Sequence, residues 1–421
     1  MILPIIYLIT LFIAPQLWIE PFIGIRIDLY IYPIWALYVL LSGKYTNFRL
    51  GPQEKFFILW IVWISISLIA NGVFIERWDN IVFFYIKWFV LYFLISTSLT
   101  SNNNIYIFFF VIVVLAIILC IEGIDHYQNE IGWAGQRLGW IDGPGKGRTQ
   151  WINIFDGPGV FCVVYTVALP FILFMIDINS KIIYKIIFFP IFGLFAVAIY
   201  FNGSRGGLLT TLAILSMHFG RNYIKKNKII LIFIVVCIFS VIAFLPSHMT
   251  QVSDEHHSSA HRVEMWAQGC EMIKQNPFFG IGRGGFAEYT GQLVAHNSLV
   301  EIMGETGLPG LFFWIALIYF SLKQLLIFLN ENISIKKKER DLILSRALFI
   351  SIIGYLISSM FVTLEYELFY VLLSACSVFG RHLKLPIEIT TKDIKIIFLI
   401  EFGWVVFINA FTILLGPGAF S

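Results

Sequence analysis

Long apolar runs alternate with short polar segments along almost the whole chain. A helix that crosses a membrane needs about 20 mostly apolar residues, and thirteen runs approach that length. The pattern predicts an all-α polytopic membrane protein with about 12–13 transmembrane helices, forming a single integral membrane domain over residues 1–421. The predicted spans lie near 2–19, 27–43, 56–75, 81–99, 105–124, 159–176, 182–201, 207–220, 229–246, 298–322, 347–363, 366–380 and 396–415.

The composition agrees with a chain whose main partner is a lipid bilayer. Hydrophobic residues make up 58% of the sequence and charged residues only 13%, whereas soluble domains carry about a quarter charged residues. The mean hydropathy is +0.82. The net charge of +3 says little as a total, and we predict no nucleic-acid partner. The placement of the charges along the chain is more informative.

Basic clusters predict the orientation of the spans, because Lys and Arg accumulate in cytoplasmic loops. With a cytoplasmic N-terminus, clusters such as "RNYIKKNK" and "SIKKKERDLILSR" lie inside. The loop 125–158, the turn "FNGSRGG" and the large loop 247–297 then lie outside. We therefore expect function on the extracytoplasmic, periplasmic side, with part of the active site in the loop 247–297.

The turn "FNGSRGG" places Arg205 between Ser204 and the glycines Gly206 and Gly207. Glycines let a ligand approach the backbone, and a guanidinium binds phosphate through two parallel hydrogen bonds. The alternative is an arginine that reaches to the membrane surface beside a flexible turn. Spacing alone leaves both interpretations open.

The large loop is predicted to contain a short amphipathic helix. In "HRVEMWAQGCEMIKQNPFFGIGRGGF" the apolar positions recur with helical spacing, Arg262 lies at the start, and Asn276-Pro277 ends the pattern. The following "GIGRGG" matches the dinucleotide fingerprint, but no preceding buried strand is evident and the segment is predicted to be extracytoplasmic, where dinucleotides are scarce. We interpret it as a flexible loop that carries Arg283.

Two histidines of the same loop, His257 and His261, have the i, i+4 spacing of a zinc-binding pair. The surrounding "SDEHHSSAH" is polar, and no third ligand accompanies the pair. Because the acidic residues and His256 beside the pair belong to the same polar stretch, we interpret the histidines as parts of a solvated loop, and we predict no metal site and no cofactor.

The stretch "AHNSLVEIMGETGLPG" places His296, Asn297, Glu301 and Glu305 at the start of a predicted span. Ionisable groups are costly there unless they face protein or water. Histidine accepts a proton near neutral pH, Asn297 can cap the helix, and the two glutamates share one helix face. The alternative is an ordinary capped helix end with a packing seam, which explains the glycines well and the glutamates poorly. The glycines are Gly304, Gly307 and Gly310.

Together, "SRGG", the loop sequence and "AHNSLVEIMGETGLPG" resemble the O-antigen ligase and Wzy-type polysaccharide polymerase superfamily of bacterial envelope enzymes. The resemblance is strongest over 201–310. It implies a metal-independent, inverting glycosyltransferase of the inner membrane that acts in cell-envelope and lipopolysaccharide biosynthesis. The donor would be an undecaprenyl-diphosphate-linked glycan, and the acceptor a hydroxyl of a lipid A core or of a growing polysaccharide chain.

The resemblance also implies roles for individual residues. Arg205 and Arg262 match the family arginines that bind the diphosphate, and His296 matches the family histidine, which we interpret as the general base. Two fixed guanidiniums can stabilise a departing diphosphate more in the transition state than in the ground state. Further predicted substrate-binding residues are Arg283, Asn297, Glu301, Ser204 and Gly206.

Two alternatives remain open at the level of sequence. Ligase and polymerase differ only in the acceptor, and the sequence does not decide between them. From another class, a lipid-linked glycan transporter or flippase would explain Lys87 within a predicted span. A transporter also predicts inverted repeats, which the sequence does not display, and it gives no reason for polar residues to gather on one side.

Overall fold

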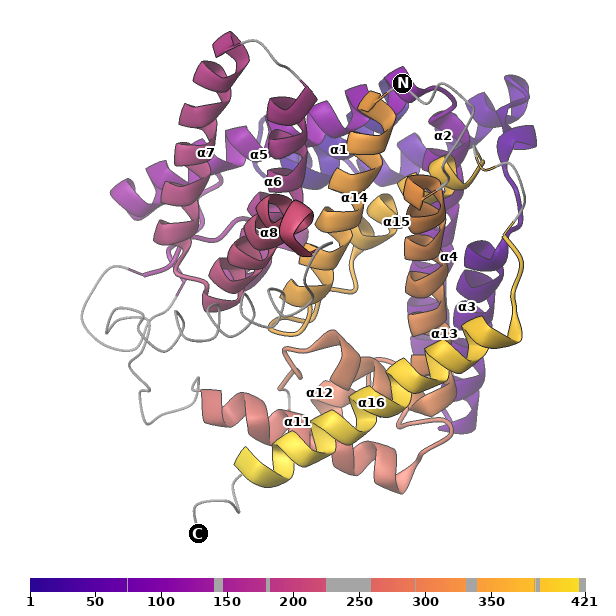
Figure 1. The fold of residues 1–421 in the computed structure, drawn as a ribbon. Helices are drawn as coiled ribbons and strands as arrows, with labels where there is room; N and C mark the ends of the chain where they lie inside the picture. Colours follow the sequence, from indigo (N-terminus) through magenta and orange to yellow (C-terminus); the bar gives the residue numbers. More distant parts are fainter. Residues whose placement is uncertain are drawn as a thin grey trace. The chain divides into compact units, whose positions relative to one another are not determined.

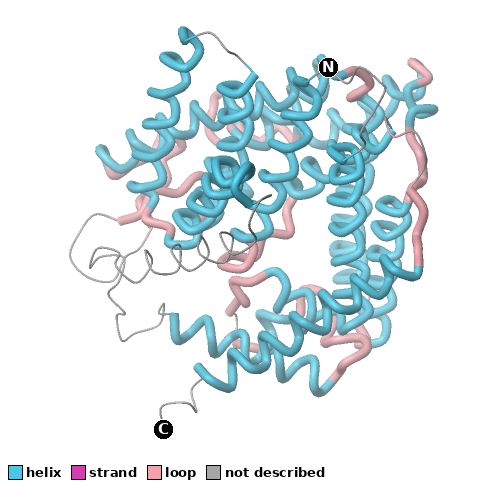
Figure 2. The backbone as a smooth tube through the Cα atoms, in the orientation of Figure 1, coloured by secondary structure: helices cyan, strands magenta, loops and turns pink. Residues whose placement is uncertain are grey.

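The computed structural model describes residues 1–73, 75–139, 147–178, 182–224, 259–291, 293–330, 339–381, 383 and 387–415. Within these residues the regular secondary structure is helical (Figure 1; Figure 2). The extended pairs among them are isolated bridges between residues 131 and 156. The predicted all-α class is therefore confirmed.

Seven helices of the described residues are long and apolar enough to cross a membrane. This confirms the polytopic membrane fold. The seven are α3 (Pro52–Ala70), α4 (Ile75–Ser98), α5 (Asn102–Asn129), α6 (Pro158–Ile178), α13 (Ser298–Asn330), α14 (Glu339–Ser358) and α16 (Thr391–Leu415).

Of the other predicted spans, the one near 229–246 lies outside the described residues. The run near 2–19 is not one helix. It ends at Phe12, because Ala14 adopts a left-handed backbone (φ 50°) and Pro15 begins a separate 3₁₀ turn. Five other helices of the described residues coincide with predicted spans: α1 (Ile2–Phe12), α2 (Ile27–Leu41), α7 (Ile182–Asn202), α8 (Arg205–Ile224) and α15 (Glu367–Arg381).

The loops predicted outside the membrane are partly helical. Helix α5 continues to Asn129, so the loop predicted from residue 125 begins only at Glu130. The large loop contains α11 (Ser259–Gln275), which confirms the predicted amphipathic helix and its end before Asn276. A single further turn, α12 (Phe286–Tyr289), follows the glycine-rich segment.

The chain divides into two compact units. The first comprises Met1–Asn47, Thr97–Gln251 and Glu331–Ser358. In it, α6 packs against α5, α7, α8 and α14. Leu169 and Leu173 of α6 form a buried core with Ile214 of α8 and Ile350 of α14.

The second unit comprises Phe48–Ser96, Val252–Asn330 and Ser359–Ser421. Its central element is α13, which packs against α3, α11, α15 and α16. Stacked rings join these helices: the ring centroids of Phe56 and Phe320 lie 5.3 Å apart, and those of Phe57 and Tyr370 lie 4.8 Å apart. The unit therefore builds its core around the helix that follows His296.

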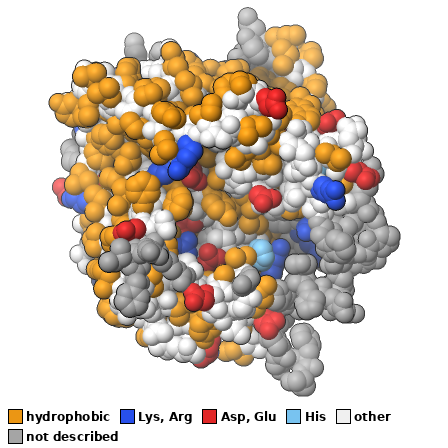
Figure 3. All heavy atoms as spheres, turned by 180° about the vertical axis from the view of Figure 1, so that it is seen from behind, with side chains coloured by type: hydrophobic (Ala, Val, Ile, Leu, Met, Phe, Trp, Pro, Cys, Tyr) orange, Lys and Arg blue, Asp and Glu red, His pale blue; other side chains and the backbone are white. Residues whose placement is uncertain are grey.

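Hydrophobic side chains cover much of the face drawn in Figure 3. Large apolar residues are also exposed along the helices that are long enough to cross a membrane, as expected for surfaces that contact lipid tails. The most exposed include Ile69, Phe83, Leu399, Phe402, Ile413 and Leu414.

Candidate functional site

In the first unit, Arg205 opens α8 directly after a capped turn. The Ser204 side-chain oxygen accepts a hydrogen bond from the Gly207 N–H at 3.1 Å, which satisfies one of the free donors at the helix start. Arg205 is exposed, and among the described residues no hydrogen bond or ion pair holds its guanidinium. A free guanidinium at a helix N-terminus is well suited to an anion, because the helix dipole favours negative charge there.

Gly207, the second glycine after Arg205, serves helix packing. A Cβ at Gly207 would lie 2.1 Å from Cys162 Sγ, so α8 approaches α6 there as closely as only a glycine permits. Thr210 adds a contact between α8 and α14. Its hydroxyl donates to the Gly206 carbonyl at 2.8 Å and lies 3.0 Å from the hydroxyl of Ser358, the last residue of α14. These contacts fix the start of α8, and with it the backbone of Arg205.

In the second unit, α11 carries Arg262 in its first turn, with the side chain partly exposed. Four residues later, the Trp266 indole N–H donates to the Ala295 carbonyl at 2.9 Å. Ala295 directly precedes His296. The helix that bears Arg262 is thus attached to the backbone beside the predicted base.

Two small residues let α11 and α13 cross closely. A Cβ at Gly269 would lie 2.4 Å from Val300 Cγ1, and one at Gly304 would lie 2.9 Å from Met272 Sδ. This supports part of the packing interpretation of the glycines after His296. The helix crossing also fixes α11 relative to the first turns of α13.

His296 stands immediately before α13 in an uncommon backbone conformation, with φ at 50°. Its side chain is partly exposed. Asn297 caps the helix as predicted, because its Oδ1 accepts from the N–H groups of Leu299 at 3.0 Å and Val300 at 3.2 Å. A left-handed backbone is uncommon in residues other than glycine, and it is maintained only where the surrounding structure holds the residue in place.

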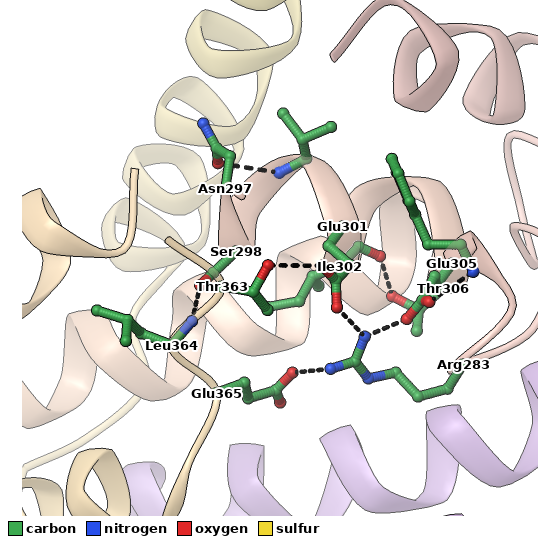
Figure 4. Close-up of polar contacts among 12 residues, drawn as sticks. Arg283, Asn297, Ser298, Glu301, Ile302, Glu305, Thr306, Thr363, Leu364 and Glu365 are labelled. Carbon is green, nitrogen blue, oxygen red and sulfur yellow. Dashed lines mark hydrogen bonds and ion pairs between the residues drawn. The ribbon is translucent and has the colours of Figure 1, made fainter. Parts of the chain in front are cut away.

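The two glutamates of α13 face a buried cluster, drawn in Figure 4. Glu301 accepts a hydrogen bond from the Thr363 hydroxyl at 2.7 Å. Glu305 accepts from the Phe286 N–H at 2.8 Å and forms an ion pair with Arg283. Helix α13 thus presents both carboxylates to groups from distant parts of the chain.

Arg283 lies at the centre of this cluster. Its side chain is 11% exposed, with one terminal nitrogen on Glu305, 3.5 Å from Glu301, and the other 2.5 Å from Glu365. Its Nε donates to the Tyr85 hydroxyl at 2.6 Å. Burial alone would lower the pKa of Arg283, but the surrounding carboxylates raise it, so the side chain remains a cation.

Glu365 and Thr363 are site residues that the sequence analysis missed. Burial raises the pKa of the Glu365 carboxyl, and Arg283 opposes that effect. The Tyr370 hydroxyl also donates to Glu365 at 3.0 Å. The available signal was an acidic residue between two apolar runs.

The structure thus gathers five of the predicted site residues in the second unit: Arg262, Arg283, His296, Asn297 and Glu301. The other three, Ser204, Arg205 and Gly206, belong to the first unit. Within the described residues, no group of three or more His, Cys, Asp or Glu side chains is arranged to hold a metal ion. His257 of the possible zinc pair lies outside those residues.

Comparison with known protein families identifies one that matches part of the chain. Residues 190–315 match the family model described as O-antigen ligase. That range contains Arg205, Arg262, Arg283 and His296, and it confirms the resemblance found in the sequence. No curated protein matches the chain.

Proposed function

Since residues 190–315 form an O-antigen ligase domain of the Wzy-type superfamily, we propose that the protein is a glycosyltransferase of the bacterial inner membrane. It transfers a glycan from an undecaprenyl-diphosphate-linked donor to an acceptor hydroxyl on the periplasmic side. The acceptor is the lipid A core in a ligase, and the end of a growing chain in a polymerase.

The observation that carries the proposal is the placement of His296. The residue is partly exposed, and its backbone is fixed on one side by the Asn297 cap and on the other by the bond from Trp266 to Ala295. A side chain that is accessible to substrate on a rigid backbone suits a general base, which must stay within hydrogen-bond reach of the proton that it removes.

The arginines supply the complementary charge. Arg205 is exposed and free among the described residues, so its guanidinium is available to the diphosphate. Arg262 lies on the helix that Trp266 attaches beside His296. We assign both to the diphosphate, where they stabilise the charge that develops on the bridging oxygen as it leaves.

The reaction follows from these roles. The acceptor oxygen attacks the anomeric carbon on the face opposite the diphosphate, and the bond from that carbon to the bridging oxygen breaks. The hydroxyl proton passes to the imidazole of His296, and the lipid diphosphate leaves with the electron pair. The new glycosidic bond has inverted configuration, and the two arginines serve in place of a metal ion.

The other predicted binding residues take supporting places in this proposal. Ser204 and Asn297 use their side-chain oxygens to cap α8 and α13, so they set the backbone beside Arg205 and His296. Gly206 lies in the first turn of α8. Glu301 accepts a hydrogen bond from the Thr363 hydroxyl, and we propose that it lines the site and contributes to substrate binding there.

The test is a transfer assay with labelled lipid-linked repeats and purified Arg205→Ala, Arg262→Ala and His296→Ala variants. Arg49→Ala, which removes an exposed arginine outside the matched residues, is the matched control. Loss of the base should lower kcat by roughly a hundred- to ten-thousandfold with donor binding retained. Loss of either arginine should lower the rate by about a hundred- to a thousandfold and weaken donor binding. Near wild-type transfer by all three variants would overturn the proposal.

The same assay separates ligase from polymerase. Lipid-linked repeats are supplied with and without a core acceptor, and the products are sized. Chain growth in the absence of core identifies a polymerase, and transfer only to core identifies a ligase. Movement of labelled donor across vesicle membranes without any product would instead indicate a transporter.

A further inference from the structure

The segment Ser359–Glu365, which connects α14 to α15, holds the first turns of α13. The Ser359 carbonyl accepts from the Ser298 N–H at 2.8 Å, and the Leu364 N–H donates to the Ser298 hydroxyl at 2.8 Å. One turn further along α13, Thr363 donates to Glu301. The segment follows the family match in sequence and lies outside it.

Arg283 joins this segment to α13 from the other side. Its guanidinium binds Glu305 of α13 and Glu365 of the connecting segment at the same time, as Figure 4 shows. With its Nε on Tyr85, every nitrogen of the guanidinium has a protein partner. The guanidinium of Arg205, in contrast, is exposed and has no hydrogen bond or ion pair among the described residues.

The backbone beside Arg283 is attached to the same helix. The Ile281 N–H donates to the Gly304 carbonyl at 3.1 Å, and the Gly282 N–H donates to the Glu305 carbonyl at 2.9 Å. These bonds satisfy two carbonyls of α13 that lack their usual helical donors, because Pro309 has no N–H to offer Glu305 and the Leu308 N–H donates to the Pro277 carbonyl instead of Gly304. The glycine-rich loop thus docks on α13.

We propose that Arg283, Thr363 and Glu365 are positioning residues for His296, and we call them the α13 brace. The α13 brace holds the first two turns of the helix, and the helix start in turn fixes the backbone of His296. Arg283 then acts through its carboxylate partners, and the diphosphate is bound by other groups. The inference rests on the proposed function, because it assigns these residues to the same transfer reaction.

The positioning role predicts a specific kinetic pattern. A displacement of about 1 Å in a catalytic group can lower a rate by roughly a hundredfold. Donor affinity does not depend on where the base stands, so it should be preserved. Disrupting the α13 brace should therefore lower kcat and leave the KM for the lipid-linked donor nearly unchanged.

Thr363→Val is the most informative variant, because it removes one hydroxyl from a partly buried position and retains the size of the side chain. Thr46→Val is the matched control, since it removes a hydroxyl bond to the backbone at an exposed position. We expect Thr363→Val to lower kcat about 3- to 30-fold with donor KM within about twofold, and Thr46→Val to match wild type. Unchanged kcat, or a rise in donor KM as the main effect, would overturn the α13 brace.

Arg283→Lys tests the shared guanidinium, because lysine keeps the charge and loses the fork that binds two carboxylates. We expect Arg283→Lys to lower kcat more than tenfold with the donor KM unchanged, and we expect a larger loss of kcat in Arg283→Gln. If the arginine binds the diphosphate instead, donor KM will rise more than tenfold in both variants. If Arg283→Gln does not fold, Thr363→Val and Arg283→Lys still distinguish a positioning role from diphosphate binding.

A double variant ties the effect to the base. Once His296 is replaced by alanine, its position no longer matters, so Thr363→Val should have no further effect on the residual rate. A full additional loss in the double variant would show that Thr363 acts elsewhere, which contradicts the inference. Normal transfer by His296→Ala alone would instead overturn the proposed function itself, so the two failures are distinguishable.

Discussion

Replacing Gly280 by alanine probes how closely the glycine-rich loop docks on α13. The residue has φ at 62°, and an added Cβ would lie 2.4 Å from the Glu305 carbonyl carbon and 2.6 Å from the Gly304 oxygen. These are backbone atoms, which cannot rotate away as a side chain does. The loop must therefore move, and the bond from Ile281 to Gly304 is lost with it.

The magnitude is best measured against Gly291→Ala. Gly291 has a similar φ of 76°, but an added Cβ would have no neighbour within 4 Å. Both variants incur the cost of a left-handed alanine, about 1–2 kcal/mol. Only Gly280→Ala adds the steric clash, about 1–3 kcal/mol, and a lost hydrogen bond, about 0.5–1.5 kcal/mol. Gly280→Ala should thus be about 2–4 kcal/mol less stable than Gly291→Ala.

Thermal unfolding of the purified protein in detergent, followed by tryptophan fluorescence, measures this difference. Each kcal/mol shifts Tm by about 2–4 °C in a unit of this size, so Gly280→Ala should melt at least about 4 °C below Gly291→Ala. Transfer activity should fall in Gly280→Ala alone. Two variants that melt within about 1 °C of each other would refute the close docking of the loop.

Two further predictions concern the helix starts. Asn297→Ala should lower stability by about 0.5–2 kcal/mol and reduce transfer, because it removes the cap of α13; Asn297→Asp keeps the acceptor and should stay close to wild type in the same melting and transfer assays. Gly207→Ala should destabilise the first unit by about 1–3 kcal/mol through its clash with Cys162. Cys162→Ala in the same chain removes the Sγ at 2.1 Å and keeps the Cβ at 2.8 Å, so it should restore part of the loss in Tm, and no restoration would contradict the proposed clash.

Local patterns in the sequence predicted the elements of the site well. The end of α11 before Asn276 and the cap at Asn297 depend on residues that are neighbours along the chain. The same is true of the apolar runs that became α3, α6 and α13. The run near 2–19 was mispredicted because Pro15 follows a left-handed Ala14, a local break that hydropathy alone does not register.

Contacts between distant segments were the part that the sequence did not reveal. Glu365 lies 82 residues from Arg283, and Tyr85 lies 198 residues from it. No periodicity or spacing connects such positions, so the sequence placed Arg283 among the substrate-binding residues without indicating its carboxylate partners. In the fold, its charge is shared among carboxylates of α13 and of the segment before α15.

The position of the α13 brace also limits which segments of this protein can be exchanged with those of a relative. Residues 190–315 are recognisable as a family domain, yet the contacts that hold the helix after His296 come from Ser359–Glu365, and Arg283 donates to Tyr85. A chimera that transplants only the recognisable domain into a relative would separate Arg283 from Glu365. An exchange of acceptor specificity with a relative should therefore succeed only when residues 190–315 and Ser359–Glu365 are transferred together.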